Sequence, residues 1–266
     1  MNIFVSEMRQ YRKSAVAWVI TYAVLLPLVM SAMPMFVEES GAIKDMLSKL
    51  PEAVLASLEI NPDLFTGSVG YFSYVFLYIG LTAAVQALNL GLSVISKENR
   101  MKTVDFLLSK PVPRAFIYLQ KLSAALAVLF ISQVSFYIAA VVSVSIQSPD
   151  GFDFKTFALI ALTFTFIQLF FLCLGMFLAV LFDRIKSAVS LTMGVAFGVF
   201  FIGMVSSIAD SEALRYLSPL RYFDNGYIIA NGAYETRFLA LAWILTLLFA
   251  AAGFVVFIKK DVRAAV

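Results

Sequence analysis

Six uninterrupted apolar stretches dominate this chain of 266 residues and limit what it can fold into. Each is about 20 residues or longer, and a helix that rises 1.5 Å per residue needs about 20 residues to cross the ~30 Å hydrocarbon layer of a membrane. Core helices of a water-soluble domain show shorter apolar runs. The stretches predict membrane-spanning helices at residues 15–37, 69–95, 122–146, 157–182, 188–208 and 238–258.

The composition also indicates an integral membrane protein. Hydrophobic residues make up 61% of the chain, charged residues make up 14%, and the mean hydropathy is +0.90. So few polar side chains could not cover the water-facing surface of a domain this large. We therefore expect an all-α, polytopic fold in which residues 1–266 form a single transmembrane domain. The first stretch is too long for a signal peptide and lacks a convincing cleavage site, so we interpret it as an anchor.

The positions of the basic residues predict which side of the membrane each loop faces. Of the 20 Lys and Arg residues, 14 lie in the N-terminal segment, the loops after the second and fourth spans, and the C-terminal tail. The acidic residues gather mostly in the other loops. Because loops rich in Lys and Arg stay on the inner side, we expect the N- and C-termini to be cytoplasmic.

Some residue types and sequence motifs are absent, and their absence argues against several kinds of chemistry. No Walker A string G-x-x-x-x-G-K-[ST] occurs, so we do not expect the chain to bind ATP by that route. The predicted spans contain no Asp, Glu, His, Lys or Arg, which argues against catalysis in the bilayer and against an ion-coupled pump. His is absent altogether, and the single Cys173 cannot form an intrachain disulfide. We expect no catalytic, metal or cofactor site, so energy for any transport would have to come from a partner.

Two outer loops are long enough to carry structure of their own. In residues 38–68, apolar residues recur at helical spacing on both sides of Pro51, which predicts two short amphipathic helices on the outer surface. Residues 209–237 are rich in Tyr and contain Pro219, Gly226 and Gly232. We expect this second loop to form an interfacial cap.

The loop at residues 96–114, after the second span, is the most informative segment. Met101, Val104 and Leu108 recur at i, i+3 and i+7 among charged residues, which predicts a helix with an apolar stripe. Pro111 and Pro113 would end this helix before the third span. The spacing alone is also typical of a helix that rests on the lipid headgroups and is held there by basic residues.

This segment resembles the coupling region of ATP-binding cassette (ABC) transporter type-2 permeases. In that family a Glu precedes a Thr, a Leu-Leu-Ser, a Pro-Val and an Arg. The matching residues here are Glu98, Thr103, Leu107, Leu108, Ser109, Pro111, Val112 and Arg114. One departure is Lys102, where many relatives carry Gly.

The resemblance extends over most of the chain. The N-terminal segment looks like the family's basic amphipathic elbow helix, through Phe4, Glu7, Arg9, Arg12, Ser14 and Trp18. The run Leu50-Pro51-Glu52 with Val54, Leu55 and Gly70-Tyr71 is similar to the family's external segment, and residues 218–224 look like the motif before its last span. The order and spacing of these motifs on six spans carry the resemblance.

The resemblance implies partners and a way of coupling. A permease of this kind pairs with a second permease copy or a related permease, and with a cytoplasmic nucleotide-binding ATPase subunit that holds the ATP and Mg. The loop would dock in a groove of that subunit, with Glu98 and Arg114 as polar anchors and Met101, Val104 and Leu108 as the buried stripe. Closure of the ATPase on ATP would then move the attached spans.

The second span carries a candidate translocation path. Tyr71, Tyr74, Tyr78 and Asn89 fall within an arc of about 60° when each residue turns about 100°. Similar exporters build their path from the second and fifth spans of two permeases, so this face would line it. The alternative places Tyr71 and Tyr74 in an outer aromatic belt and uses Asn89 to join helices.

Other polar and small residues in the spans favour helix packing. Gln86, Gln133 and Gln168 are expected to form hydrogen bonds between helices. Gly194 and Gly198 form a G-x-x-x-G motif on the fifth span, which allows another helix to approach closely. Packing within one subunit is the default explanation for this motif, and packing across a dimer is the alternative.

These observations predict the membrane-spanning permease subunit of an ABC-type exporter, located in the bacterial cell (inner) membrane. An amphipathic cargo such as an antimicrobial peptide, a drug or a lipid-like molecule is implied by the resemblance alone. Two alternatives stay open: a non-transporting membrane sensor or scaffold that uses the same loop, and a secondary transporter.

Overall fold

The computed structural model describes residues 3–38, 49, 51, 54–55, 67–101, 112–149, 151–182, 185–209 and 211–259, in which helices and turns are the only regular structure. The all-α prediction is confirmed. The helices are α1 (Ile3–Met30), α2 (Met33–Glu38), α5 (Ser68–Met101), α7 (Arg114–Gln147), α8 (Phe154–Leu181), α9 (Ala188–Ile208), α10 (Glu212–Arg215), the 3-10 helix η2 (Pro219–Arg221), α11 (Asn225–Asn231) and α12 (Thr236–Lys259).

Six of the described helical segments are long and apolar enough to cross a membrane, which confirms the predicted number of spans. They are α1 together with the start of α2, then α5, α7, α8, α9 and α12. Several helices extend beyond the predicted spans, because hydropathy marks the part of a helix that lies in lipid, whereas backbone hydrogen bonding continues past it. Glu7, Lys97 and Lys121 therefore belong to long helices and not to loops.

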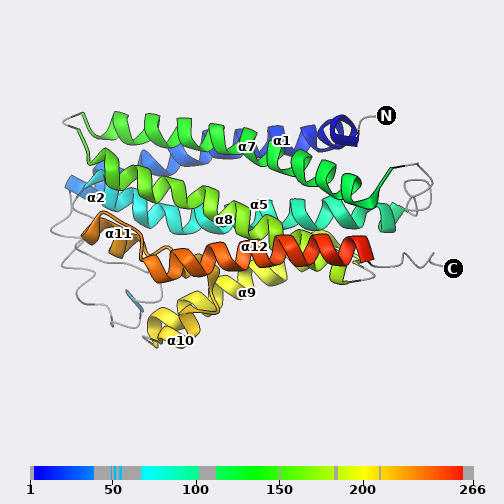
Figure 1. Cartoon of the computed structure of the whole chain (residues 1–266). Helices are drawn as coiled ribbons and strands as arrows, with labels where there is room; N and C mark the ends of the chain where they lie inside the picture. Colours follow the sequence, from blue (N-terminus) through cyan, green and yellow to red (C-terminus); the bar gives the residue numbers. More distant parts are fainter. Residues whose placement is uncertain are drawn as a thin grey trace.

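The long helices run side by side, with α5 and α8 at the centre (Figure 1). α5 packs against α8, α1 packs along α7, α12 packs against α8 and α9 packs against α5. In the most apolar part of each helix, 67% of the α5 residues and 61% of the α8 residues are buried, compared with 22% for α1 and α9 and 17% for α12. The outer helices thus present large apolar surfaces to their surroundings.

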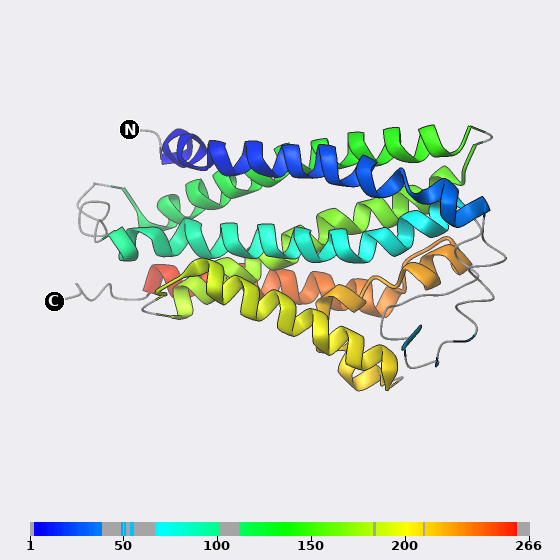
Figure 2. The same ribbon diagram turned by 180° about the vertical axis from the view of Figure 1, so that it is seen from behind.

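Both ends of the chain lie at the same end of the bundle. α1 begins and α12 ends there, and we call it the terminal end; α2, α10 and α11 lie at the opposite end (Figures 1 and 2). The first turns of α1 are seen nearly end-on while the rest of the helix runs across the view, so α1 bends near its start (Figure 2). This bend fits the predicted elbow.

A pair of glycines brings α5 and α8 into backbone contact. A Cβ atom built on Gly91 would lie 2.5 Å from the Leu172 carbonyl oxygen, and one built on Gly175 would lie 2.6 Å from the Leu88 carbonyl oxygen. Real Cβ atoms do not approach so closely, so only glycine fits at these two positions. The centre of the bundle depends on this close crossing.

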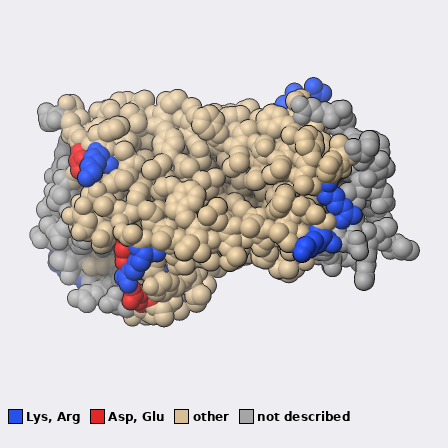
Figure 3. Space-filling model, viewed as in Figure 1, with Lys and Arg blue, Asp and Glu red and all other residues tan. Residues whose placement is uncertain are grey.

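Charged side chains avoid the middle of the molecule. On the face drawn in Figure 3, Lys, Arg, Asp and Glu lie towards the two ends of the bundle, with a broad uncharged band between them. The Asp and Glu side chains visible on this face lie at the opposite end, while Lys and Arg are seen at both ends. An uncharged band of this kind is what a lipid-embedded surface requires.

Candidate functional site

Three charged side chains from three helices meet inside the terminal end of the bundle. Glu7 of α1 forms ion pairs with Lys97 of α5 and with Lys121 of α7, whose Nζ lies 3.1 Å from Glu7 Oε1. All three residues are buried, with exposed fractions of 4%, 8% and 1%. We call Glu7, Lys97 and Lys121 the ionic cluster.

Neighbouring groups complete the hydrogen bonding of the ionic cluster. Lys121 Nζ also donates to the Val94 carbonyl oxygen at 2.6 Å, and Lys97 Nζ donates to Gln10 Oε1 at 2.5 Å. The Lys97 ammonium lies 5.2 Å from the centroid of the Tyr11 ring. Because a buried charge is tolerated only when it is paired and hydrogen-bonded, these contacts account for the placement of three charges out of water.

The sequence pattern did not predict the ionic cluster, although a signal for it exists. Glu7, Gln10 and Tyr11 stand at i, i+3 and i+4, on one face of α1. Glu7 lies on the buried side of that helix, as do Ala15 and Tyr22. A carboxylate that falls on an apolar stripe is the signature of a buried ion pair, but its partners lie 90 and 114 residues away.

The predicted coupling loop is described only at its two ends. α5 continues without a break to Met101, so the first part of the loop extends the second span and is not a separate helix. Glu98 and Met101 lie in this last part of α5, and their side chains are not described. Thr103, Val104, Leu107, Leu108 and Pro111 lie outside the described residues.

Arg114 lies at the first position of α7 and contacts the end of α12. Its Nη1 donates a hydrogen bond of 3.5 Å to the Ile258 carbonyl oxygen. Ile258 lies in the last turn of α12, where carbonyl groups have no partner within the helix. Within this chain, Arg114 therefore joins the far side of the coupling loop to α12.

A buried polar network joins four helices in the middle of the bundle. Gln86 Oε1 accepts hydrogen bonds from the Tyr22 hydroxyl and from Gln168 Nε2, each 2.9 Å long, and Gln86 Nε2 donates to Ser132 Oγ at 2.8 Å. These residues come from α5, α1, α8 and α7. The prediction that Gln86 and Gln168 join helices is confirmed; Gln133 lies partly exposed on α7.

The face of α5 that is predicted to line the translocation path divides into two parts. Tyr71 is buried, and its hydroxyl donates to the Val29 carbonyl oxygen of α1 at 3.1 Å, so it holds two helices together. Tyr74 and Tyr78 face each other with hydroxyl oxygens 3.4 Å apart, and Tyr78 is 41% exposed. Asn89 is partly exposed and lies about three helical turns after Tyr78 on the same side of α5.

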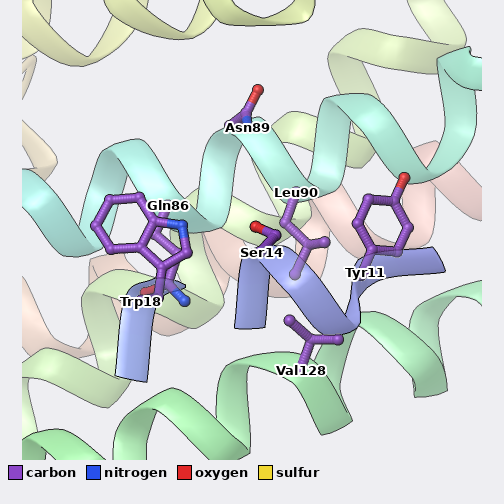
Figure 4. A pocket seen from close by; sticks show the side chains of 7 residues that line it. All are labelled: Tyr11, Ser14, Trp18, Gln86, Asn89, Leu90 and Val128. Carbon is purple, nitrogen blue, oxygen red and sulfur yellow. The ribbon is translucent and has the colours of Figure 1, made fainter. Parts of the chain in front are cut away.

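A small pocket lies between α1, α5 and α7. It is lined by Tyr11, Ser14, Trp18, Gln86, Asn89, Leu90 and Val128. Figure 4 shows Trp18 and Tyr11 extending from α1 towards α5, whereas the Asn89 amide points away from α1. The cavity volume open to the centre of a water molecule is about 20 Å³, so the cavity can hold about one water. It is too small to hold a cargo molecule.

Gly194 and Gly198 do not pack against another helix in the part of the chain that the structure describes. A Cβ built on either glycine meets no heavy atom within 4 Å there, so the described residues do not supply the packing partner expected within one subunit. α9 instead buries Ala188, Thr192 and Ala196, and the glycine face turns outward. Packing across a dimer stays a prediction.

The predicted cap forms over the opposite end of α9 and α5. Arg215 of α10 pairs with Glu235 at 2.7 Å, and its guanidinium lies 3.8 Å from the centroid of the Phe238 ring in α12. Ser218 Oγ donates to the Val199 carbonyl oxygen of α9 at 3.0 Å, and Asn225 Nδ2 donates to the Ser73 carbonyl oxygen of α5 at 2.9 Å. The cap therefore ties α9, α5 and α12 together at this end.

Burial within the cap lowers the acidity of Tyr222. The Tyr222 hydroxyl donates to the Tyr216 carbonyl oxygen at 2.6 Å, and burial raises the pKa of Tyr222 to about 12. Tyr222 therefore stays neutral throughout the physiological range and acts as a hydrogen-bond donor that closes the turn of the cap.

Comparison with known proteins identifies the family. A family model described as ABC-2 family transporter protein matches residues 1–262, which include all six candidate membrane-spanning helices, the ionic cluster and the predicted coupling loop. A search of curated proteins finds no match to the chain. The match leaves out only the last few residues, so the chain belongs to the ABC-2 family of transporter proteins and is a membrane protein of that family.

Proposed function

We propose that this chain is the permease subunit of an ABC-type exporter in the bacterial inner membrane. It would form the translocation path and be coupled through residues 96–114 to a separate cytoplasmic ATPase subunit. The family match over residues 1–262, together with six membrane-spanning helices, carries this proposal. Since the sequence contains no Walker A string, the ATP and Mg would be bound by the partner and no cofactor by this chain.

The distribution of charge supports a cytoplasmic terminal end. The bundle has an even number of spans, and 14 of the 20 Lys and Arg residues lie in the N-terminal segment, between the second and third spans, between the fourth and fifth spans, or in the C-terminal tail. The positive-inside rule then places the terminal end in the cytoplasm and the cap outside. This orientation puts the coupling loop on the side where ATP is available.

Two long helices lead directly into the coupling loop. α5 runs from Ser68 to Met101 and α7 begins at Arg114, so the loop is attached to 34-residue helices on both sides. α5 is also the most buried of the spans. A displacement of the loop by a partner would therefore reach the centre of the bundle through continuous helix.

The side of α5 that other helices leave incompletely covered is the best candidate for the path. Tyr74, Tyr78 and Asn89 lie on it, whereas Tyr71 serves to attach α1. α9 packs beside α5 and turns Gly194 and Gly198 outward, which would allow a second permease copy to approach closely. Tyrosine hydroxyls on an otherwise apolar surface suit an amphipathic cargo, which can hydrogen-bond and also bury apolar area.

The experiment that tests the proposal is co-purification of the detergent-solubilised chain from its native membrane, followed by mass spectrometry of bound subunits. We expect the wild-type chain to bring with it a subunit with a Walker A motif, and the double variant Glu98→Lys with Leu108→Asp to lose it. The matched control is Glu212→Lys with Leu217→Asp, which makes the same changes at the cap, where Glu212 and Leu217 are exposed.

Two outcomes would contradict the proposal. Absence of any ATPase under conditions that preserve membrane complexes would favour a sensor, a scaffold or a secondary transporter. Equal loss of the ATPase from the loop variant and from the cap variant would show that docking does not depend on residues 96–114.

A further inference from the structure

The ionic cluster lies on the two helices that carry the coupling loop. Lys97 directly precedes Glu98 near the end of α5, and Lys121 lies in the second turn of α7, after the loop. Glu7, which pairs with both lysines, comes from neither helix but from the first turns of α1. A single carboxylate therefore joins the helix that enters the loop to the helix that leaves it.

The hydrogen bonds of the two lysines have different targets. Lys97 bonds to α1 through Glu7 and Gln10. Lys121 bonds to Glu7 of α1 and also to the Val94 carbonyl oxygen of α5. Removal of Lys97 would thus loosen the contact between α1 and α5 and leave the α7 contacts in place, whereas removal of Glu7 would loosen both.

Further along the bundle, α1 stays attached to α7. Ser135 Oγ of α7 donates to the Val19 carbonyl oxygen of α1 at 2.9 Å, and the two helices pack along each other. Contacts between α1 and α5 are sparser, and the small water-sized pocket lies between them. The ionic cluster is therefore a direct connection between α1 and α5 at the terminal end, where Glu7 bonds to Lys97.

A purely stabilising contact in this place would not need charge. Apolar side chains of similar volume often stabilise a buried site as well as an ion pair does, because they avoid the cost of desolvation. Charged pairs instead restrict a site to one geometry, since any separation leaves an unpaired charge out of water. Such a restriction is useful where neighbouring helices must keep their relative positions while a partner protein exerts a force on one of them.

We propose that Glu7, Lys97 and Lys121 are positioning residues that fix α1 to both helices flanking the coupling loop, so that the terminal ends of α1, α5 and α7 move as one rigid body. This proposal rests on the proposed function for the cause of that movement, which is an ATPase that acts on residues 96–114. The rigid connection itself is a property of this chain alone.

The test measures distances between helices by pulsed electron paramagnetic resonance on the full chain in detergent. Spin labels are placed at Val5 of α1, Ser93 of α5 and Leu119 of α7 in pairs, and the buried Cys173 is replaced by Ala to remove the native thiol. The pair at Val5 and Leu119 reports on α1 and α7, and the pair at Val5 and Ser93 reports on α1 and α5. Glu212→Gln neutralises a carboxylate of an exposed ion pair at the opposite end and is the matched control.

The variants give different expected results. Glu7→Gln should widen both distance distributions about twofold, Lys97→Gln should widen only the distribution for α1 and α5, and Glu212→Gln should change neither. If Glu7→Gln does not fold, Lys97→Gln still decides the question, because it keeps the Glu7 to Lys121 pair. Unchanged widths in Glu7→Gln, or equal widening of both pairs in Lys97→Gln, would overturn the proposal.

A second arm adds the co-purified ATPase, free of nucleotide and then trapped with ATP and vanadate. In the native chain both distances should be the same in the two nucleotide states, whereas in Glu7→Gln the distance between α1 and α5 should differ between them. A shift of that distance in the native chain would overturn the rigid-body proposal. Failure to capture any ATPase would contradict the proposed function and leave the result of the first arm standing.

Discussion

Gly91 of α5 and Gly175 of α8 face each other so closely that a Cβ atom built on Gly91 would lie 3.1 Å from the Gly175 Cα. The same atom would lie 2.5 Å from the Leu172 carbonyl oxygen, which a backbone cannot accommodate without moving. Both helices are the most buried of the bundle. The crossing of these two glycines therefore sets the distance between the central helices.

Gly91→Ala should destabilise the protein, because the added methyl group forces α5 and α8 apart. Overpacking of this kind costs about 1–3 kcal/mol of unfolding free energy. Unfolding of the purified chain in mixed micelles, titrated with SDS and followed by Trp fluorescence, measures this cost. Gly194→Ala is the control, since open space surrounds Gly194, and a similar loss of stability in both variants would contradict the packing described.

Gln86→Leu should loosen the centre of the bundle, because Gln86 makes hydrogen bonds to Tyr22, Ser132 and Gln168. Hydrogen bonds between membrane helices contribute about 0.6 kcal/mol each on average, so we expect a loss of about 2 kcal/mol. Gln133→Leu, at a partly exposed position of α7, should change stability by less than about 0.5 kcal/mol. The same SDS titration measures both, and equal effects would show that Gln86 is not the centre of a network.

Two of the ion pairs in the cap should differ in strength. The Arg215 and Glu235 side chains are 17% and 14% exposed, whereas Arg237 and Glu212 are each 55% exposed. A double-mutant cycle with Ala substitutions should give a coupling energy of about 1 kcal/mol for the first pair and no resolvable coupling for the second, because water screens exposed charges. A larger coupling in the exposed pair would contradict the proposed role of Arg215 in holding the cap to α12.

Substituted cysteines can test whether the α5 face meets water. In a Cys173→Ala background, Tyr78→Cys should react with a membrane-impermeant thiol reagent when the chain is in its native membrane, because we place Tyr78 in the path. Tyr71→Cys should stay unreactive, since Tyr71 is buried against α1. Protection of Tyr78→Cys would show that this face meets lipid and would contradict the path assignment.

The membrane-spanning core was predictable because lipid imposes a simple rule on sequence. Four of the six predicted spans fall within single helices, the fourth ends one residue past α8, and the first crosses from α1 into α2, since a segment in hydrocarbon must satisfy its backbone internally and carry apolar side chains. The ends of the helices were harder to predict. α7 begins at Arg114, eight residues before the predicted third span, because a helix that enters water or a protein interior no longer needs apolar residues.

The ionic cluster and the glycine pair were missed for a different reason. Both depend on contacts between residues far apart in the sequence. A local pattern marks Glu7 as lying on the buried side of α1, but no local pattern identifies its partners or pairs the two glycines. Gly194 and Gly198 carry the recognisable motif but face outward, whereas Gly91 and Gly175 are single glycines that happen to meet. Glu7 was recognised as part of the elbow, and its pairing with Lys97 and Lys121 required the three-dimensional arrangement.

The measurement that tests the central proposal most directly is photo-cross-linking from the coupling loop in the native membrane. A photoreactive phenylalanine analogue replaces Leu108, and the control position is Tyr227, which is exposed in α11 at the opposite end. We expect irradiation to attach the Leu108 position to a subunit that carries a Walker A motif and to leave the Tyr227 position without that product. A Leu108 position that cross-links only to lipid, or a Walker A subunit attached equally from both positions, would contradict a coupling role for this loop.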